Sequence, residues 1–185
     1  MHSFSVPSLF ILFFLSTTLF SSSAAVASVE ETCKGITSVR PDVGYDFCVS
    51  SLESDPDSVS ADPDGLAVVA IRLSIANATA VAAKIESLMR GGEEDQSDPS
   101  LRECLGVCAE VYSDAVDHLN QALASIRARS YGDAVTFLSA ALDAADNCED
   151  AFGDLGWGTS PVAAEDRDYG RLADIALAIG ASLGR

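Results

Sequence analysis

The stretch LRECLGVCAEVYSDAVDHLNQALASI (residues 101–126) has the clearest periodicity in the 185-residue chain. Its apolar positions recur at intervals of four and three residues, and they are Leu101, Leu105, Cys108, Tyr112, Ala115, Leu119, Ala122 and Ile126. An α-helix places residues with this spacing on one side. The stretch therefore predicts a long helix with an apolar seam of the kind found in antiparallel bundles and coiled coils.

A second helix of the same kind begins at Ser130, after a very short turn near residue 129. Its apolar positions step by three and four residues, and they are Tyr131, Ala134, Leu138, Ala141, Ala145, Cys148 and Phe152. A short connection makes two helices antiparallel neighbours. We therefore expect the two helices to form the centre of the fold.

Two further helical patterns flank this pair, one from Asp64 to about Arg90 and one from about Arg167 to Leu183. The first shows two seven-residue repeats, made by Leu66, Leu73 and Ala80 and by Val69, Ala76 and Ala83. Ile71, Ile75 and Ile85 broaden its apolar stripe, so we expect this helix to be buried on more than one side. The second places Leu172, Ala176, Ile179 and Leu183 on one face. The fold class is predicted to be all-α, with an up-down-up-down four-helix bundle over residues 64–185.

Residues 28–63 precede the bundle and predict a small helical hairpin followed by a turn. Pro41 separates its two helices, and Asp42 is expected to cap the second one. Cys33 and Cys48 lie on opposite arms, where a bridge would close a loop of 16 residues. Such a bridge stabilises by about 3 kcal/mol in the chain-entropy model.

Cys108 and Cys148 lie at similar heights on the two central helices, about 21 residues before the turn and about 19 after it. They are therefore placed to form a second disulfide. Cys104 lies one turn further along, level with residue 152 or 153, and is left either free or paired with an external thiol.

Residues 1–27 are expected to be a signal peptide that is removed in the mature protein. The run Leu9 to Phe20 is apolar, and Ala25-Val26-Ala27 is a suitable cleavage site. The run is shorter than the roughly 20 residues that a membrane span needs, although a short membrane anchor is the alternative interpretation. We expect a secreted, soluble domain over residues 28–185, an oxidising environment for its cysteines, and no association with a membrane.

The net charge of −17 belongs entirely to the mature part of the chain. So acidic a surface disfavours nucleic acid and anionic lipid as partners. It favours a cationic protein partner, or serves solubility alone.

The mature chain lacks the groups that a catalytic or metal site needs. Its one histidine, His118, is ten residues from Cys108, about 15 Å along one helix,. The two side chains therefore cannot act together. We expect no enzyme activity, no cofactor and no metal site. One modification is predicted, because Asn77-Ala78-Thr79 is a glycosylation sequon in a secreted chain.

Several segments together resemble the plant invertase inhibitor and pectin methylesterase inhibitor family. They are Glu31-Thr32-Cys33, Tyr45-Asp46-Phe47-Cys48, Gly65-Leu66-Ala67, Cys108-x-x-x-Tyr112-x-x-Ala115-Val116, Leu138-Ser139-Ala140-Ala141-Leu142, Cys148-Glu149-Asp150-Ala151-Phe152, Ser160-Pro161 and Ile175-Ala176-Leu177-Ala178-Ile179. The resemblance covers essentially the whole mature chain, and its pattern agrees with the pairs Cys33–Cys48 and Cys108–Cys148. It implies a monomeric inhibitor of the apoplast that forms a stoichiometric complex with pectin methylesterase or with acid invertase.

The resemblance leaves the target enzyme open. Invertase inhibitors of the family often carry Pro-Lys-Phe near the start of the third bundle helix, and the stretch Arg129 to Ala134 lacks it. This favours pectin methylesterase, whose substrate cleft the bundle would cover. Asp143 stands where esterase inhibitors commonly have Thr, which favours invertase. A secreted helical module without inhibitory activity is the third possibility.

The spacing of Ser139, Asp143 and Asp146 puts them on one face of the third bundle helix,. With the resemblance, this predicts that they contact the partner enzyme. The loop residue Trp157 is expected either to pack over the end of the bundle or to be exposed for binding.

Overall fold

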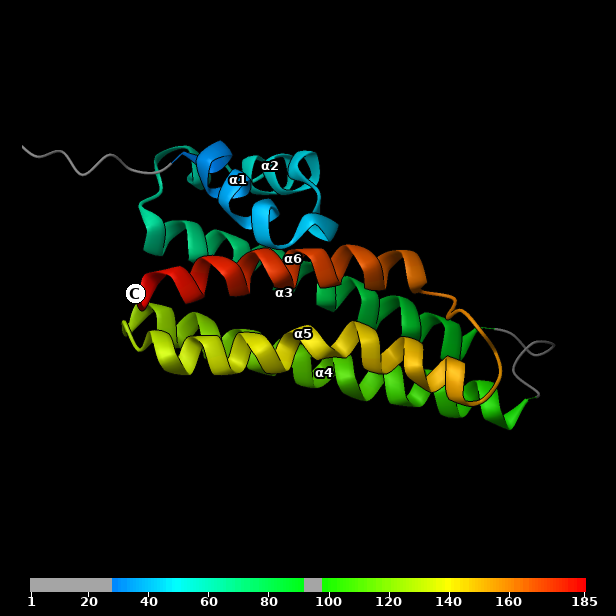
Figure 1. Cartoon of the computed structure of the whole chain (residues 1–185). Helices are drawn as coiled ribbons and strands as arrows, with labels where there is room; N and C mark the ends of the chain where they lie inside the picture. Colours follow the sequence, from blue (N-terminus) through cyan, green and yellow to red (C-terminus); the bar gives the residue numbers. More distant parts are fainter. Residues whose placement is uncertain (1–27, 92–97) are drawn as a thin grey trace, which may run out of the picture.

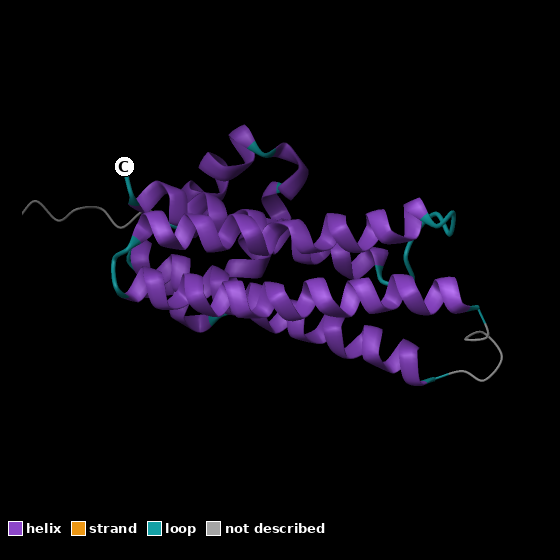
Figure 2. Ribbon diagram, turned by 90° about the horizontal axis from the view of Figure 1, so that it is seen from below, coloured by secondary structure: helices purple, strands orange, loops and turns teal. Residues whose placement is uncertain are grey.

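The computed structural model describes residues 28–91 and 98–185 of the chain, so the expected signal peptide lies outside the described residues. Figure 2 shows the described residues as helices joined by loops. In chain order these elements are α1 (Val29–Val39), η1 (Pro41–Val43), α2 (Tyr45–Glu53), η2 (Pro56–Ser60), α3 (Pro63–Arg90), α4 (Pro99–Arg127), α5 (Tyr131–Asp154) and α6 (Ala163–Leu183).

Helices α3 to α6 form the predicted up-down-up-down four-helix bundle (Figure 1). Each packs against its neighbours in chain order, and α6 closes the ring against α3. Helix α5 therefore lies diagonally opposite α3. The α4–α5 turn is only three residues long and contains Arg129, whose positive φ of 57° reverses the chain sharply.

The starts of the long helices follow from local sequence. Asp62 precedes Pro63 at the start of α3, and Asp98 precedes Pro99 at the start of α4. Each aspartate accepts a backbone N–H of the first turn, while proline fits a first-turn position whose N–H has no helical partner. Ser28 and Glu31 form a reciprocal capping box at the start of α1.

The predicted seams of α4 and α5 are confirmed. Of the fifteen predicted seam residues, all but Leu101 and Tyr131 are buried, and these two pack at the edge of the core. The regular four-and-three spacing of apolar residues determined the inward side of both helices.

The predicted inward face of α3 is only partly correct. Ala76, Ala80 and Ala83 are exposed and Leu73 is half-buried. The predicted residues Leu66, Val69, Ile71 and Ile85 are buried, together with Ala67, Ala70, Ser74, Ala78 and Val81, which were not predicted. Alanine occurs on every side of this helix, so seven-residue repeats of alanine did not distinguish its inward side. By length and composition alone α3 would also qualify as a membrane span, but its large apolar side chains face α4 and α6.

The N-terminal hairpin packs on the outer side of the bundle against α3 and α6 (Figure 1). Its predicted cap is also wrong, because Asp42 lies in η1 and the residue that caps α2 is Gly44, with φ 76°. Helix α6 lies between the hairpin and the other helices of the bundle. For this reason six consecutive residues, Leu172 to Leu177, are buried.

Candidate partner-binding surface

The outward side of α5 carries the three residues predicted to contact a partner. Ser139, Asp143 and Asp146 are all exposed, while the inward residues Leu138 and Ala145 are buried. The structure therefore places the three side chains on one accessible strip.

The charge on this side of the molecule is strongly segregated. Helix α5 carries no lysine or arginine and six acidic residues, which are Asp133, Asp143, Asp146, Glu149, Asp150 and Asp154. Between Arg102 and Arg127, α4 adds four more and no basic residue except His118. In residues 28–91 and 98–185 every ion pair lies on the hairpin, η2, α3 or α6. The α4–α5 side is thus an acidic surface without internal neutralisation, and it complements a cationic partner.

A groove of about 550 Å³ runs beside this strip, between α5, α6 and the hairpin. Asp146 lies in its wall on α5, and Asp42 lines it from the hairpin. Two arginines hold the hairpin beside the groove. Arg40 pairs with Asp174 of α6, and the Arg171 guanidinium lies 3.7 Å from the centre of the Phe47 ring. The hairpin therefore extends the accessible surface beyond α5.

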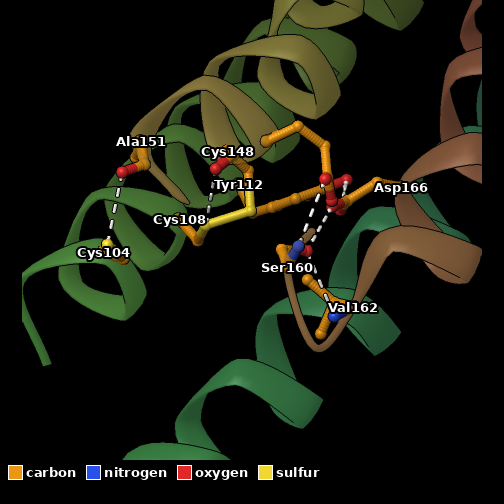
Figure 3. Close-up of a disulfide and its surroundings, with 9 residues drawn as sticks. Cys104, Cys108, Tyr112, Cys148, Ala151, Ser160, Val162 and Asp166 are labelled. Carbon is orange, nitrogen blue, oxygen red and sulfur yellow. Dashed lines mark hydrogen bonds between the residues drawn. A yellow bond between two sulfur atoms is a disulfide. The ribbon is translucent and has the colours of Figure 1, made fainter. Parts of the chain in front are cut away.

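A buried polar network lies at the base of the groove (Figure 3). The Tyr112 hydroxyl donates to Oδ1 of Asp166 at 2.6 Å, and the Ser160 hydroxyl donates to Oδ2 at 3.1 Å. The Ser160 backbone N–H donates to Oε2 of Glu149 at 3.2 Å. Burial, reinforced by the neighbouring Glu149, raises the pKa of Asp166 to about 7. Asp166 is therefore protonated in an acidic medium.

Sequence reasoning missed this network. It assigned Asp166 to a loop, whereas α6 begins at Ala163 and buries Asp166 in its first turn. Acidic residues are so numerous in this chain that nothing in the pattern singles out one buried carboxyl. The burial of Tyr112 was predicted, but its hydrogen-bonding partner was not.

The structure joins Cys33 to Cys48 and Cys108 to Cys148, with Cα–Cα distances of 5.8 and 4.6 Å. The first bridge closes the hairpin on itself and the second ties α4 to α5. Cys104 is a buried free thiol one turn from Cys108, and its sulfur lies 3.3 Å from the Ala151 carbonyl oxygen (Figure 3). Burial raises the pKa of this thiol, which lowers its reactivity,.

Three other residues considered from the sequence lie away from the α5 strip. Asn77 is half-buried in α3, and its Oδ1 is sealed from solvent without a described partner, which disfavours glycosylation there. Trp157 is 41% exposed, and its Nε1 donates to the Ser100 hydroxyl at 3.1 Å. His118 is half-buried and stacks on Phe137.

The family model described as "Plant invertase/pectin methylesterase inhibitor" matches residues 27–179. The chain belongs to this family. Membership places it among protein inhibitors and not among enzymes. The chain with this disulfide-closed hairpin, bundle and buried polar network is therefore a member of an inhibitor family.

Individual relatives agree with this assignment. A protein of Platanus orientalis named "Putative invertase inhibitor" is 38% identical over 84% of this chain and 89% of its own length. A "Pectinesterase inhibitor" of Actinidia deliciosa is 37% identical over 57% of this chain and 55% of its own. The crystal structure of a mutant form of a pectin methylesterase inhibitor from Arabidopsis superposes with a TM-score of 0.65. The two sequences are 26% identical, and the superposition covers 79% of this chain and 95% of the Arabidopsis inhibitor chain.

Proposed function

We propose that this protein inhibits pectin methylesterase by forming a stoichiometric complex that covers the substrate cleft of the enzyme. The inhibitor performs no chemistry in this mechanism. Its folded surface excludes the polysaccharide from the cleft. The protein acts as a monomer in the apoplast, after removal of the apolar segment at its N-terminus.

The observation that carries the proposal is the exposed acidic strip Ser139–Asp143–Asp146 on a fold that matches a pectin methylesterase inhibitor over most of its length. A strip of unneutralised carboxylates attracts a cationic surface on the enzyme and fixes the orientation of docking. The adjoining groove and hairpin enlarge the surface that the enzyme can bury.

Acid invertase is the second candidate target. It is favoured by the name of the 38% identical relative from Platanus orientalis and by Asp143. The residues of the α4–α5 turn favour the esterase, because the stretch Arg129 to Ala134 contains no Pro-Lys-Phe. The same acidic strip would serve either enzyme, so activity assays against both are the deciding experiment.

The test is inhibition by the purified, disulfide-bonded protein of a plant pectin methylesterase and of a cell-wall acid invertase at about pH 5.5, which lies above the usual carboxyl pKa values. Loss of esterase activity near one equivalent supports the proposal. Loss of invertase activity alone assigns the second target, and no effect on either enzyme points to the non-inhibitory module.

A further inference from the structure

Two carboxyl groups meet in the interior beside the Cys108–Cys148 bridge. Asp166 is only 2% exposed, and Glu149 lies beside it, since Ser160 donates a hydrogen bond to each of the two carboxyl groups. Oε1 of Glu149 is sealed from solvent and receives no N–H or O–H from another described residue. A hydrogen bond between two carboxyl groups requires a proton on one of them, because two adjacent carboxylates repel each other. The two groups therefore stay side by side at low cost only when one of them holds a proton.

This pair fastens the loop between α5 and α6. Ser160 is the contact, since its backbone N–H donates to Glu149 at 3.2 Å and its hydroxyl donates to Asp166 at 3.1 Å. The Ser160 hydroxyl oxygen in turn accepts the backbone N–H of Val162 at 3.2 Å. Ser160 is 5% exposed, so these bonds have no competing water at the surface. The loop that carries Trp157 is thus attached to the bundle through both carboxyl groups.

We propose that the Glu149–Asp166 pair forms a pH-dependent contact with the α5–α6 loop. The contact holds the loop around Ser160 while one carboxyl group of the pair is protonated, and it weakens when that proton is lost. Loss of the proton puts two negative charges in contact in a nearly dry site. The least costly relief is for Glu149 to swing out toward the groove that both residues line. That movement removes the acceptor of the Ser160 N–H and loosens the part of the loop around Ser160, while the bond from Trp157 to Ser100 is not affected.

The surroundings favour this pair as the responsive element. Burial, with a further contribution from Glu149, raises the pKa of Asp166 to about 7, while the hydrogen bonds from Tyr112 and Ser160 lower it. The nearby cations are already paired with other carboxylates. Lys84 of α3 forms an ion pair with Glu165 at 2.6 Å, and Arg171 of α6 forms one with Asp168 at 2.6 Å. The other charged groups that line the groove are Arg40, Asp42, Asp146, Arg167 and Asp174. We therefore expect the contact between the carboxyl pair and the Ser160 loop to be formed in an acidic compartment and weakened above neutral pH.

Hydrogen exchange of the intact, disulfide-bonded chain tests the proposal without reference to any enzyme. The readout is the protection factor of the Ser160 and Val162 amides from about pH 5 to pH 9, each rate corrected for the base-catalysed exchange of an unstructured amide. We expect protection to fall through a single transition with a midpoint within about one unit of 7. Trp157 is the only tryptophan, and its emission should shift to the red in the same range.

Glu149→Gln is the informative variant, because the amide of glutamine can donate to Asp166 and carries no charge that repels Asp166 when Asp166 loses its proton. The transition should disappear and the loop should stay protected throughout. Asp166→Asn provides a second route to the same result if the first variant folds poorly. Asp150→Asn is the matched control, since Asp150 is the exposed neighbour of Glu149, and it should retain the transition. Constant protection in the unsubstituted protein, or a transition that survives in Glu149→Gln, would overturn the proposal.

Discussion

The Tyr112 hydroxyl lies 2.6 Å from Oδ1 of Asp166, and this bond connects the middle of α4 to the first turn of α6. The two residues are 54 positions apart in sequence, and neither is more than 2% exposed. The Tyr112 ring also meets the Tyr169 ring edge-on at 5.1 Å. Tyr112 therefore joins the apolar core to the polar network through one side chain.

Replacing Tyr112 by phenylalanine keeps the ring and removes the bond. We expect Tyr112→Phe to lower the free energy of unfolding by about 1–3 kcal/mol, because an acceptor on Asp166 stays buried without its donor. Chemical denaturation at about pH 5.5 measures the loss. Tyr131→Phe is the matched control, since the Tyr131 hydroxyl donates to Asp64 in a partly exposed site and its removal should cost clearly less. Equal losses in the two variants would contradict the importance assigned to the buried network.

Stability should fall as the pH rises from about 5.5 to about 8.5. The pKa of Asp166 is raised from 3.8 to about 7 by burial, so the folded protein holds a proton in this window that the unfolded chain has lost. Linkage then gives a decrease on the order of 2 kcal/mol. Burial also raises the pKa of Asp174, opposed by Arg40, so any contribution of this group has the same sign. The carboxyl groups with lowered pKa values, such as Asp55 and Glu165, act only in more acidic solution.

The test of this pH dependence is urea denaturation at several pH values in that window, with Asp166→Asn compared with Asp150→Asn. The first variant should flatten the profile, and the second should leave it unchanged. A profile that Asp166→Asn leaves as steep as before would exclude Asp166 as its source.

The two disulfides should have different effects when they are removed. Replacing Cys33 and Cys48 by alanine should cost about 3 kcal/mol and loosen the hairpin, because that bridge closes no contact with the bundle. Replacing Cys108 and Cys148 should cost about 4 kcal/mol in the same model, because its loop is longer, and should destabilise the whole bundle,. Hydrogen exchange distinguishes the two results, since in the first variant the amides of α4 and α5 should stay protected. Loss of protection in α4 in that variant would show that the hairpin and the bundle fold as one unit.

The acidic strip on α5 should control inhibition and not stability. We expect Asp143→Asn combined with Asp146→Asn to weaken inhibition at least about tenfold, because close interfacial charge pairs contribute about 1.5–7 kcal/mol. The free energy of unfolding should change by less than about 0.5 kcal/mol, as both residues are exposed. Glu86→Gln is the control, because Glu86 is an exposed carboxylate on α3, diagonally opposite α5. If the double variant, Glu86→Gln and the unsubstituted protein inhibit equally well, the partner surface lies elsewhere.

Asp143→Thr separately tests the departure from the esterase-inhibitor pattern. If α5 faces the esterase, the change should alter the inhibition constant for pectin methylesterase, because a charged contact becomes a neutral one. The measurement is the inhibition constant of the variant against that of the unsubstituted protein. An unchanged constant would argue against the assignment of this face.

Large apolar residues at regular spacing made the bundle predictable from the sequence. The seam of α4 contains a large side chain at every seventh residue, at Leu105, Tyr112, Leu119 and Ile126, and such a pattern has one consistent inward side. In alanine-rich α3 the alanine positions were assigned to the wrong side, because alanine is tolerated inside and outside,. The start of α6 was placed late, since the polar run Glu165-Asp166-Arg167 looks like a loop unless one knows that Asp166 is buried.

The functional surface was less predictable than the fold. Helical spacing was enough to put Ser139, Asp143 and Asp146 on one face. The groove beside them depends on how the hairpin docks on α6 through Arg40 and Phe47. These two residues are far from α5 and from α6 in the sequence. Long-range contacts of this kind leave no periodic signal in a single chain.

The most direct test of the central claim is a titration of pectin methylesterase with the purified, disulfide-bonded protein at about pH 5.5, run beside an identical titration of cell-wall acid invertase. We predict that esterase activity falls to its minimum near one equivalent of inhibitor while invertase activity is unchanged. Full esterase activity at a large excess of a correctly folded inhibitor, or loss of invertase activity alone, would contradict the account.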